Sequence, residues 1–152
     1  MKEKIIINEE YLNENKTQLL NDAPLDYLYG KDVFFTVGFN QNKSILFQMI
    51  GNLGAYANDY EYDDSISVFV LSDSYYDHVK KGFKDEILKK VERKLNSKRE
   101  SKEKPLPIAD KKPLVITKSS LIDFVKKRIA YYNDQVTQDL INSLQGSCMT
   151  LF

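Results

Sequence analysis

The sequence of 152 residues contains no tryptophan, a single cysteine and a single histidine. One cysteine cannot form a disulfide within the chain, and such sparse use is typical of proteins from a reducing compartment. With only His78 and Cys148, the chain has no cluster of histidines and cysteines of the kind that binds zinc. It also lacks the partners from which a histidine-based nucleophilic triad would be predicted. We therefore expect no metal site, no cofactor and no catalytic triad.

An excess of charge of one sign is also missing. Lysine plus arginine and aspartate plus glutamate number 22 each, so the formal net charge is zero, which argues against a general polyanion binder. The charges are unevenly distributed, because acids predominate over residues 1–79 and bases over residues 80–104. This asymmetry predicts a positive face opposite a negative one.

Long apolar runs are absent as well. No segment approaches the roughly 18 apolar residues that a membrane-spanning helix requires. The apolar run at residues 5–7 is short and is followed by acids, which is unlike a signal peptide. The expectation is a cytoplasmic protein with no membrane partner.

The apolar residues that are present, 42% of the chain, are enough for the core of one domain. Nearly continuous apolar runs at residues 33–37, 66–71 and 114–116 predict three buried strands. Residues 55–62 alternate, with Tyr56, Tyr60 and Tyr62 on one side, and predict an exposed edge strand. Residues 5–7 are a further short-strand candidate.

Helical spacing of apolar residues follows the first and second buried strands and the last one. The first helix follows Asn40 or Asn42 and ends near Gly54, the second covers residues 75–98 with a break at Gly82, and the third follows Thr117 or Ser119. Weaker helical patterns lie at residues 8–20 and 134–144. The order β-α-β-β-α-β-α predicts an α/β fold, in which helices flank a central, mostly parallel, four-stranded sheet. The apolar positions expected to face the core are Ile45, Leu46, Met49, Ile50, Leu53, Phe83, Ile87, Leu88, Val91, Leu95, Leu121, Ile122, Val125 and Ile129.

Several short motifs stand at the ends of these elements. They are Leu28-Tyr29-Gly30-Lys31, Thr36-Val37-Gly38-Phe39, Leu53-Gly54-Ala55, Ser67-Val68-Phe69-Val70-Leu71 and the run from Pro113 through Leu114-Val115-Ile116-Thr117 to Phe124. In their order and spacing they resemble the BRCT domain family. The resemblance divides the chain into an N-terminal lead-in, residues 1–27, a BRCT-like domain, residues 28–132, and a C-terminal helix and tail, residues 133–152. The chain departs from the family in lacking the tryptophan of the final helix, near which Phe124 stands, and in a longer segment at residues 83–112.

The resemblance implies a function without catalysis. BRCT domains bind phosphorylated peptides, DNA ends or other proteins, often within replication and repair machinery, so a protein partner is expected here. In phosphopeptide-binding members, a hydroxyl and the following glycine at the end of the first strand meet the phosphate together with a lysine from the second helix.

Carried over to this chain, the phosphate-binding candidates are Thr36, Gly38, Lys80, Lys81 and Lys84. The residue directly before Gly38 is Val37, which has no hydroxyl, and alternation along the strand turns Thr36 to the opposite side. The alternative is that Gly38 supplies only a turn and that the lysines form only a solvated face.

Three further hypotheses remain open. The basic stretch 80–104 could bind DNA phosphates through Lys89, Lys90, Arg93 and Lys94. A small flavodoxin-like enzyme could hold a phosphate or cofactor in the Gly38 loop, although the chain has no glycine-rich fingerprint there. The edge strand and its tyrosines could pair with a second copy of the chain to form a homodimer.

Overall fold

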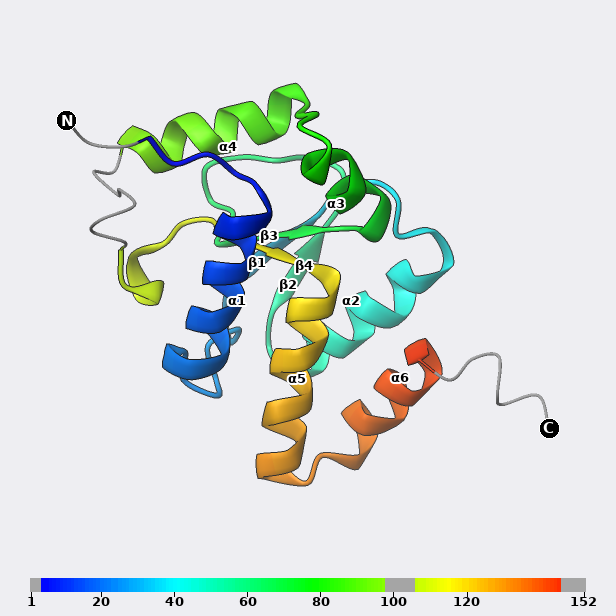
Figure 1. The fold of residues 1–152 in the computed structure, drawn as a ribbon. Coiled ribbons are helices and arrows are strands. Elements are labelled where there is room, and N and C mark those ends of the chain that lie inside the picture. The colour runs from blue at the N-terminus through cyan, green and yellow to red at the C-terminus, as the bar shows by residue number, and fades with distance from the viewer. Residues whose placement is uncertain (1–3, 98–105, 146–152) are drawn as a thin grey trace.

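The computed structural model of the chain describes residues 4–97 and 106–145. Its centre is a sheet of four parallel strands, which confirms the predicted α/β fold with a parallel four-stranded sheet and flanking helices (Figure 1). The strands are β1 (Asp32–Phe35), β2 (Tyr56–Asn58), β3 (Val68–Leu71) and β4 (Leu114–Thr117), and they lie side by side in the order β2-β1-β3-β4. Helices follow or precede every strand along the chain. They are α1 (Glu9–Asp22), α2 (Lys43–Asn52), α3 (Asp73–Lys80), α4 (Glu86–Ser97), α5 (Lys118–Tyr132) and α6 (Gln135–Gln145), with short 3₁₀ turns η1 (Asn40–Asn42) and η2 (Ile108–Asp110).

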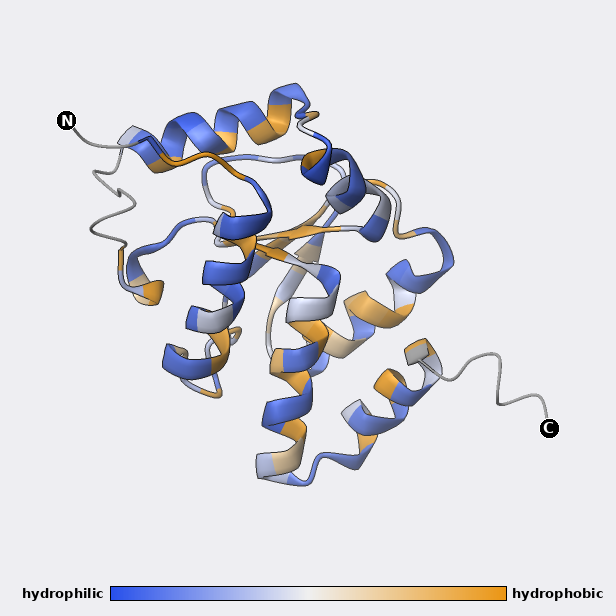
Figure 2. Cartoon of the chain, viewed as in Figure 1, coloured by the Kyte–Doolittle hydropathy of each residue, from blue (hydrophilic) through white to orange (hydrophobic). Residues whose placement is uncertain are grey.

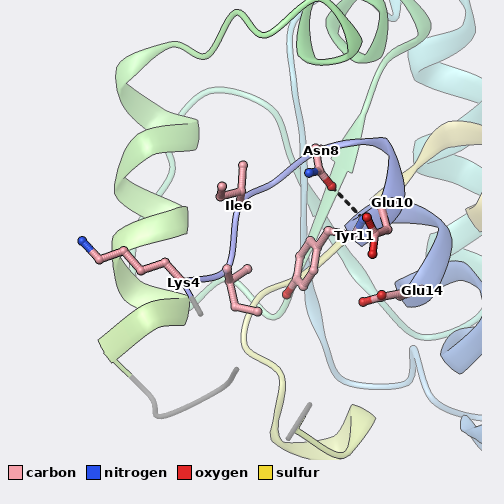
Figure 3. Close-up of a pocket in the computed structure, with 7 residues that line it drawn as sticks. Lys4, Ile6, Asn8, Glu10, Tyr11 and Glu14 are labelled. Carbon is pink, nitrogen blue, oxygen red and sulfur yellow. Dashed lines mark hydrogen bonds between the residues drawn. The ribbon is translucent and has the colours of Figure 1, made fainter. Parts of the chain in front are cut away.

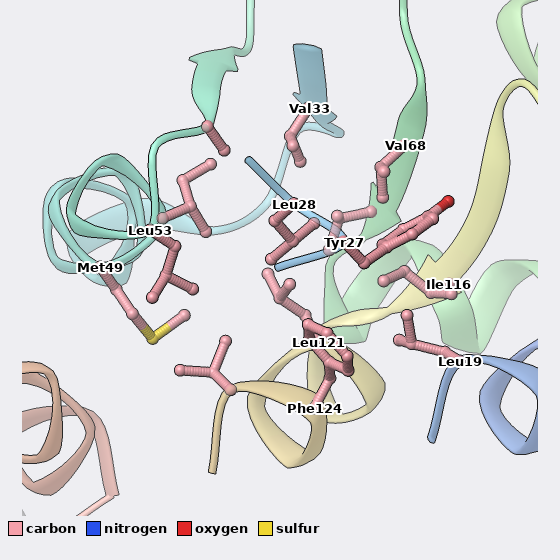
Figure 4. Packing of buried hydrophobic residues seen from close by; sticks show 14 of the residues in the cluster. Leu19, Tyr27, Leu28, Val33, Met49, Leu53, Val68, Ile116, Leu121 and Phe124 are labelled. Carbon is pink, nitrogen blue, oxygen red and sulfur yellow. The ribbon is translucent and has the colours of Figure 1, made fainter. Parts of the chain in front are cut away.

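The two faces of the sheet carry separate apolar clusters, because successive side chains along a strand point to opposite sides. Val33 and Phe35 of β1 lie in the cluster covered by α2, α5 and α6, and Figure 4 shows this packing. Phe34 lies in the cluster covered by α3 and α4. The helices turn their hydrophobic residues toward the sheet and their hydrophilic residues outward (Figure 2). Phe124 of α5 is fully buried against Tyr27.

Helix α1 closes the β4 edge of the sheet and contacts both clusters. The side-chain amide of Asn15, fully buried, donates to the backbone oxygen of Val115 at 2.8 Å. The carboxamide oxygen of Asn15 in turn accepts from the ammonium of Lys111 at 2.9 Å. The outer edge of β4 is therefore sealed by a polar side chain, whereas β2 forms the opposite edge.

Three predicted strands extend further in the sequence pattern than in the fold, and the second buried strand begins only at Val68. The first ends at Phe35, because the chain turns at Gly38 toward η1. The edge strand ends at Asn58, whose side-chain oxygen accepts from the backbone N–H groups of Tyr60 and Glu61 and turns the chain away. The prediction of a short strand at residues 5–7 is wrong. That segment joins no strand and instead lies beside α4.

The helix predicted at residues 75–98 is divided into α3 and α4 at Gly82, whose φ of +89° lies in the left-handed region. Phe83 and Ile87 do not belong to the core as expected, because the break exposes Phe83 and turns Ile87 toward the surface. The end of the basic run and the C-terminal tail, including Cys148, lie outside the described residues. Within residues 4–97 and 106–145, no helix is both long and apolar enough to cross a membrane.

Candidate functional site

The carboxyl ends of the parallel strands meet at one edge of the sheet and form a small polar hollow. It has a volume of about 150 Å³ and is lined by residues 38–42, Ser72, Asp73 and Lys118. The lining comes from the segments that follow β1, β3 and β4. Strands β1 and β3 are neighbours, but the chain leaves β1 for α2 on one face and leaves β3 for α3 on the other. In open parallel sheets such a switch point is where ligands bind.

Gly38 brings the backbone close to the start of α3. Its φ is +104°, and a Cβ atom there would lie 2.5 Å from the hydroxyl of Ser74 and 2.8 Å from that of Ser72. The Ser72 hydroxyl donates to the backbone oxygen of Val37 at 2.7 Å. The same hydroxyl accepts from the N–H of Tyr75, so Ser72 is the N-cap of α3. This close approach accepts only glycine at position 38, for steric as well as conformational reasons.

Thr36 does not line the hollow. Its hydroxyl accepts from the buried backbone N–H of Ser72 at 2.9 Å and so ties the end of β1 to the end of β3. The neighbouring Val37 is 77% exposed, in agreement with the expected alternation. Thr36 is therefore a structural link, and the hydroxyls that approach Gly38 come from Ser72 and Ser74 instead.

The predicted lysines also lie elsewhere. Lys80 and Lys81 stand at the far end of α3 from the hollow, where Lys80 pairs with Asp77 at 3.4 Å and lies over the ring of Tyr76. Lys84 precedes α4 and pairs with Glu92 at 2.6 Å. The division of the predicted long helix into two explains this outcome, because only the first turn of α3 reaches the hollow.

Lys118 is the cation of the hollow. It is the first residue of α5, directly after the cap Thr117, and its ammonium lies 3.1 Å from the carboxylate of Asp73. The sequence interpretation treated residues 117–120 only as a helix start and missed it. The available signal was that polar residues follow β1, β3 and β4 directly, and parallel strands bring such residues together.

The group of the hollow that would attract an anion is the ammonium of Lys118. The lining also includes the hydroxyl of Ser72, the carboxylate of Asp73 and the polar side chains of residues 40–42. Within the described parts of the chain, no group of three or more His, Cys, Asp or Glu side chains could hold a metal ion. His78 is an exposed residue of α3.

Comparison with known proteins adds nothing to this geometry. No protein-family model, curated protein or solved structure matches the chain.

The nucleic-acid candidates lie on α4. Lys89, Lys90 and Arg93 are exposed on the face of the helix opposite its buried residues Leu88 and Val91. Lys94 is partly buried, and its ammonium contacts the backbone oxygen and the carboxylate of Asp64 at 3.2 and 3.4 Å. Three of the four predicted residues therefore share an outward cationic surface.

The tyrosines of the predicted edge strand separate into two environments. Tyr56, the first residue of β2, and Tyr60, which follows the strand, are exposed. Tyr62 instead folds under the sheet and packs its ring against Phe34 and Phe69. This burial, together with the charges of nearby acids, raises the pKa of Tyr62 to about 12.

Proposed function

We propose that this chain is a non-catalytic, BRCT-like interaction module that binds a phosphorylated segment of a protein partner. The observation that carries the proposal is the polar hollow at the switch point between β1 and β3, where Gly38, Ser72 and Lys118 come from three different strand ends. A phosphate bound there would meet the first turn of α3 and the ammonium of Lys118, both of which favour a dianion, and would compete with Asp73 for that ammonium.

The surroundings of the hollow favour a peptide over a free ion. Val37, an apolar residue, is largely exposed directly beside Gly38. A phosphorylated segment could rest apolar side chains there while its phosphate enters the hollow. A free phosphate would gain nothing from such a neighbour.

The BRCT-like part of the proposal rests on the order of elements. From β1 to α5 the chain follows the order that the resemblance implies, with the second helix divided into α3 and α4. Positive φ values at Gly38 and Gly54 agree with the turns expected after the first strand and after the first helix. A role beside replication or repair machinery follows from the resemblance.

The direct test is binding of phosphorylated peptide mixtures to the purified chain. We expect a phosphoserine and phosphothreonine library to bind, measured by fluorescence anisotropy, and the same library without phosphate not to bind. The variant Lys118→Met removes the charge-assisted contact and should weaken binding roughly tenfold or more.

The matched control is Lys126→Met, which removes an exposed lysine from the same helix. It should leave phosphopeptide affinity unchanged. Equal affinity of both variants, or equal binding of phosphorylated and unphosphorylated libraries, would contradict the proposal.

DNA binding is the second candidate, favoured by the outward position of Lys89, Lys90 and Arg93 on α4. Binding through phosphates should weaken steeply with salt and should be reduced in a Lys90→Ala/Arg93→Ala variant. Undetectable binding to duplex and nicked DNA at low salt would exclude this function. Lys126→Met is again a suitable control.

A further inference from the structure

The N-terminal segment, residues 4–7, lies in an extended conformation beside α4 (Figure 3). Ile5 and Ile7 are buried in the same cluster as Leu88, Val91 and Leu95 of α4, whereas Ile6 between them is 55% exposed. The segment thus presents alternate side chains to the core in the manner of a strand. It nevertheless belongs to no sheet.

Two side chains of α4 hold the backbone of this segment. The N–H of Ile5 donates to the carboxamide oxygen of Asn96 at 2.7 Å, and the carboxamide nitrogen of Asn96 donates back to the oxygen of Ile5 at 3.0 Å. One helical turn earlier, the carboxylate of Glu92 accepts from the N–H of Ile7 at 2.7 Å. The amide of Asn96 therefore contacts both polar groups of one residue, as a neighbouring strand would.

Both of these side chains are held in place by other groups. The Glu92 carboxylate also accepts from the ammonium of Lys84 at 2.6 Å, and the Asn96 amide donates to the backbone oxygen of Glu92 at 2.9 Å. These contacts do not involve residues 4–7, so little side-chain freedom would be lost when a segment binds.

These contacts define what the groove accepts. Hydrogen bonds to the backbone are indifferent to sequence, and the two buried positions require only aliphatic side chains at i and i+2. Among the described residues, no backbone–backbone hydrogen bond joins residues 4–7 to a strand. Detachment of the segment would therefore leave the sheet ladder intact.

The segment also leaves room beside it. A hollow of about 350 Å³ adjoins it on the side of α1 and is lined by Lys4, Ile5, Ile6, Asn8, Glu10, Tyr11 and Glu14 (Figure 3). A segment with a larger side chain at the middle position would fill space that Ile6 leaves open. A second copy of the same chain would bring only the same isoleucine and gain nothing there.

We propose that this α4 groove, formed by Leu88, Val91, Glu92, Leu95 and Asn96, is a docking site for an extended segment of a partner protein. The segment carries aliphatic residues at i and i+2 and a large side chain between them. Residues 4–7 occupy the groove as an internal substitute for that segment. The site is independent of the hollow at Gly38.

The test uses the full chain with Ile5→Ser and Ile7→Ser, which vacates the groove without changing α4. Three labelled peptides are the probes. The first has the sequence of residues 2–8, and the second, the phenylalanine peptide, has phenylalanine at the Ile6 position. The third, the serine peptide, has serine at the Ile5 and Ile7 positions. We expect the vacated chain to bind the first two peptides, the phenylalanine peptide several-fold more tightly, and not the serine peptide. The unaltered chain should bind the first two peptides at least tenfold more weakly than the vacated chain does, because its own segment competes at high effective concentration.

The backbone contacts are tested by adding Asn96→Ala to the vacated chain, which should weaken peptide binding about tenfold through the loss of two hydrogen bonds. A folded vacated chain that binds no peptide, or that binds the serine peptide equally well, would overturn the proposal. Tighter binding of the unmodified peptide than of the phenylalanine peptide would overturn the assignment of the partner.

Hydrogen exchange on the unaltered chain decides the matter if the vacated variant does not fold. The amides of Ile5 and Ile7 should exchange at least a hundredfold faster than those of β3, because the segment detaches without global unfolding. Exchange of these amides only together with the β3 amides would make the segment an integral part of the core and would overturn the proposal.

Discussion

Gly38 and Gly82 have similar backbone conformations but different surroundings. Both have positive φ values, +104° and +89°, yet a Cβ atom would meet the Ser72 and Ser74 hydroxyls only at Gly38, and nothing within 4 Å at Gly82. The left-handed conformation alone costs an alanine about 1 kcal/mol, and a forced contact adds about 1 kcal/mol or more. We therefore expect Gly38→Ala to lower the free energy of unfolding by about 2–3 kcal/mol and Gly82→Ala by about 1 kcal/mol. Urea denaturation measures both, and equal losses would contradict the close packing at Gly38.

Asp73 competes with any anion for Lys118. Its carboxylate lies 3.1 Å from the ammonium, and 72% of its side chain is exposed to solvent, against 21% for Lys118. A phosphate must therefore share or displace an existing partner. The variant Asp73→Asn should raise the affinity for a phosphorylated peptide a few-fold, because an exposed pair of this kind contributes up to about 1 kcal/mol.

Asp77→Asn is the matched control for this prediction, since Asp77 lies on the same helix and pairs with Lys80 instead. Its phosphopeptide affinity, measured by the same anisotropy titration, should not change. A decrease of affinity in Asp73→Asn would indicate that Asp73 positions Lys118 rather than competing for it.

Tyr62 should make the fold sensitive to alkaline pH. Burial first, and the charges of Asp64 and Asp63 next, raise its pKa from 10.0 to about 12. The folded chain holds the phenol of Tyr62 neutral more firmly than the unfolded chain does. The contribution of neutral Tyr62 to the free energy of unfolding is therefore fully present below pH 10. It is lost as the pH rises through 12. Burial also raises the pKa of Tyr27 and Tyr75, so these residues contribute in the same direction.

The variant Tyr62→Phe should reduce the fall in the free energy of unfolding between pH 10 and 12. Tyr60→Phe is the control, because Tyr60 is 84% exposed. Urea denaturation at a series of pH values measures, for each variant, how steeply the free energy of unfolding falls with pH. A slope in Tyr62→Phe equal to that of the unaltered chain would show that Tyr62 ionises freely in the fold.

Among the helices and strands, local sequence patterns predicted those features that depend on residues close together in the sequence. The apolar runs became β1, β3 and β4, and the cap at Thr117 begins α5 as expected. Residues 5–7 carry the pattern of a strand as well. Their hydrogen-bond partners are side chains on α4, 85 and 91 positions away, and no local pattern identifies these.

The candidate site was predicted only in part for a similar reason. Gly38 was found because its turn has a local signature. Lys118 joins it only because β4 lies next to β3 and β3 next to β1, and strand order is a property of the whole sheet. Lys84 does not reach the site, because it follows the turn at Gly82 and pairs with Glu92 of α4.

Helix α1 depends on one buried polar contact to seal the edge of β4. The variant Asn15→Ala removes the hydrogen bond to the Val115 oxygen and the acceptor for Lys111, both in the buried interior. The loss in the free energy of unfolding should be about 1–3 kcal/mol, because the buried Val115 oxygen loses its donor and a buried polar group left unsatisfied costs about 1–3 kcal/mol. Asn13→Ala, an exposed change on the same helix, should cost less than about 0.5 kcal/mol. Similar losses in the two variants, measured by urea denaturation, would contradict this role of Asn15.

The whole molecule has one sealed sheet edge and one open one. Helix α1 covers the β4 edge, whereas β2 is a terminal strand that begins with the exposed Tyr56 and is followed by the exposed Tyr60. Edge strands that are neither covered nor charged tend to pair with another chain, and tyrosine is favoured at interfaces. Because β2 has only three residues, pairing between two copies of the chain can bury little surface.

We therefore expect weak, reversible dimerisation that appears only at high protein concentration in sedimentation velocity. The variant Tyr56→Lys places a charge on the edge strand and should abolish it, since two copies would oppose like charges across the new pair. Tyr131→Lys is the matched control, because Tyr131 is similarly exposed but lies on α5. Loss of dimerisation in both variants alike would place the dimer contact outside β2. An unaltered chain that stays monomeric at every concentration would mean that the β2 edge is too short to pair. In that case the Asn58 turn, which ends the strand after three residues, is the feature that prevents pairing.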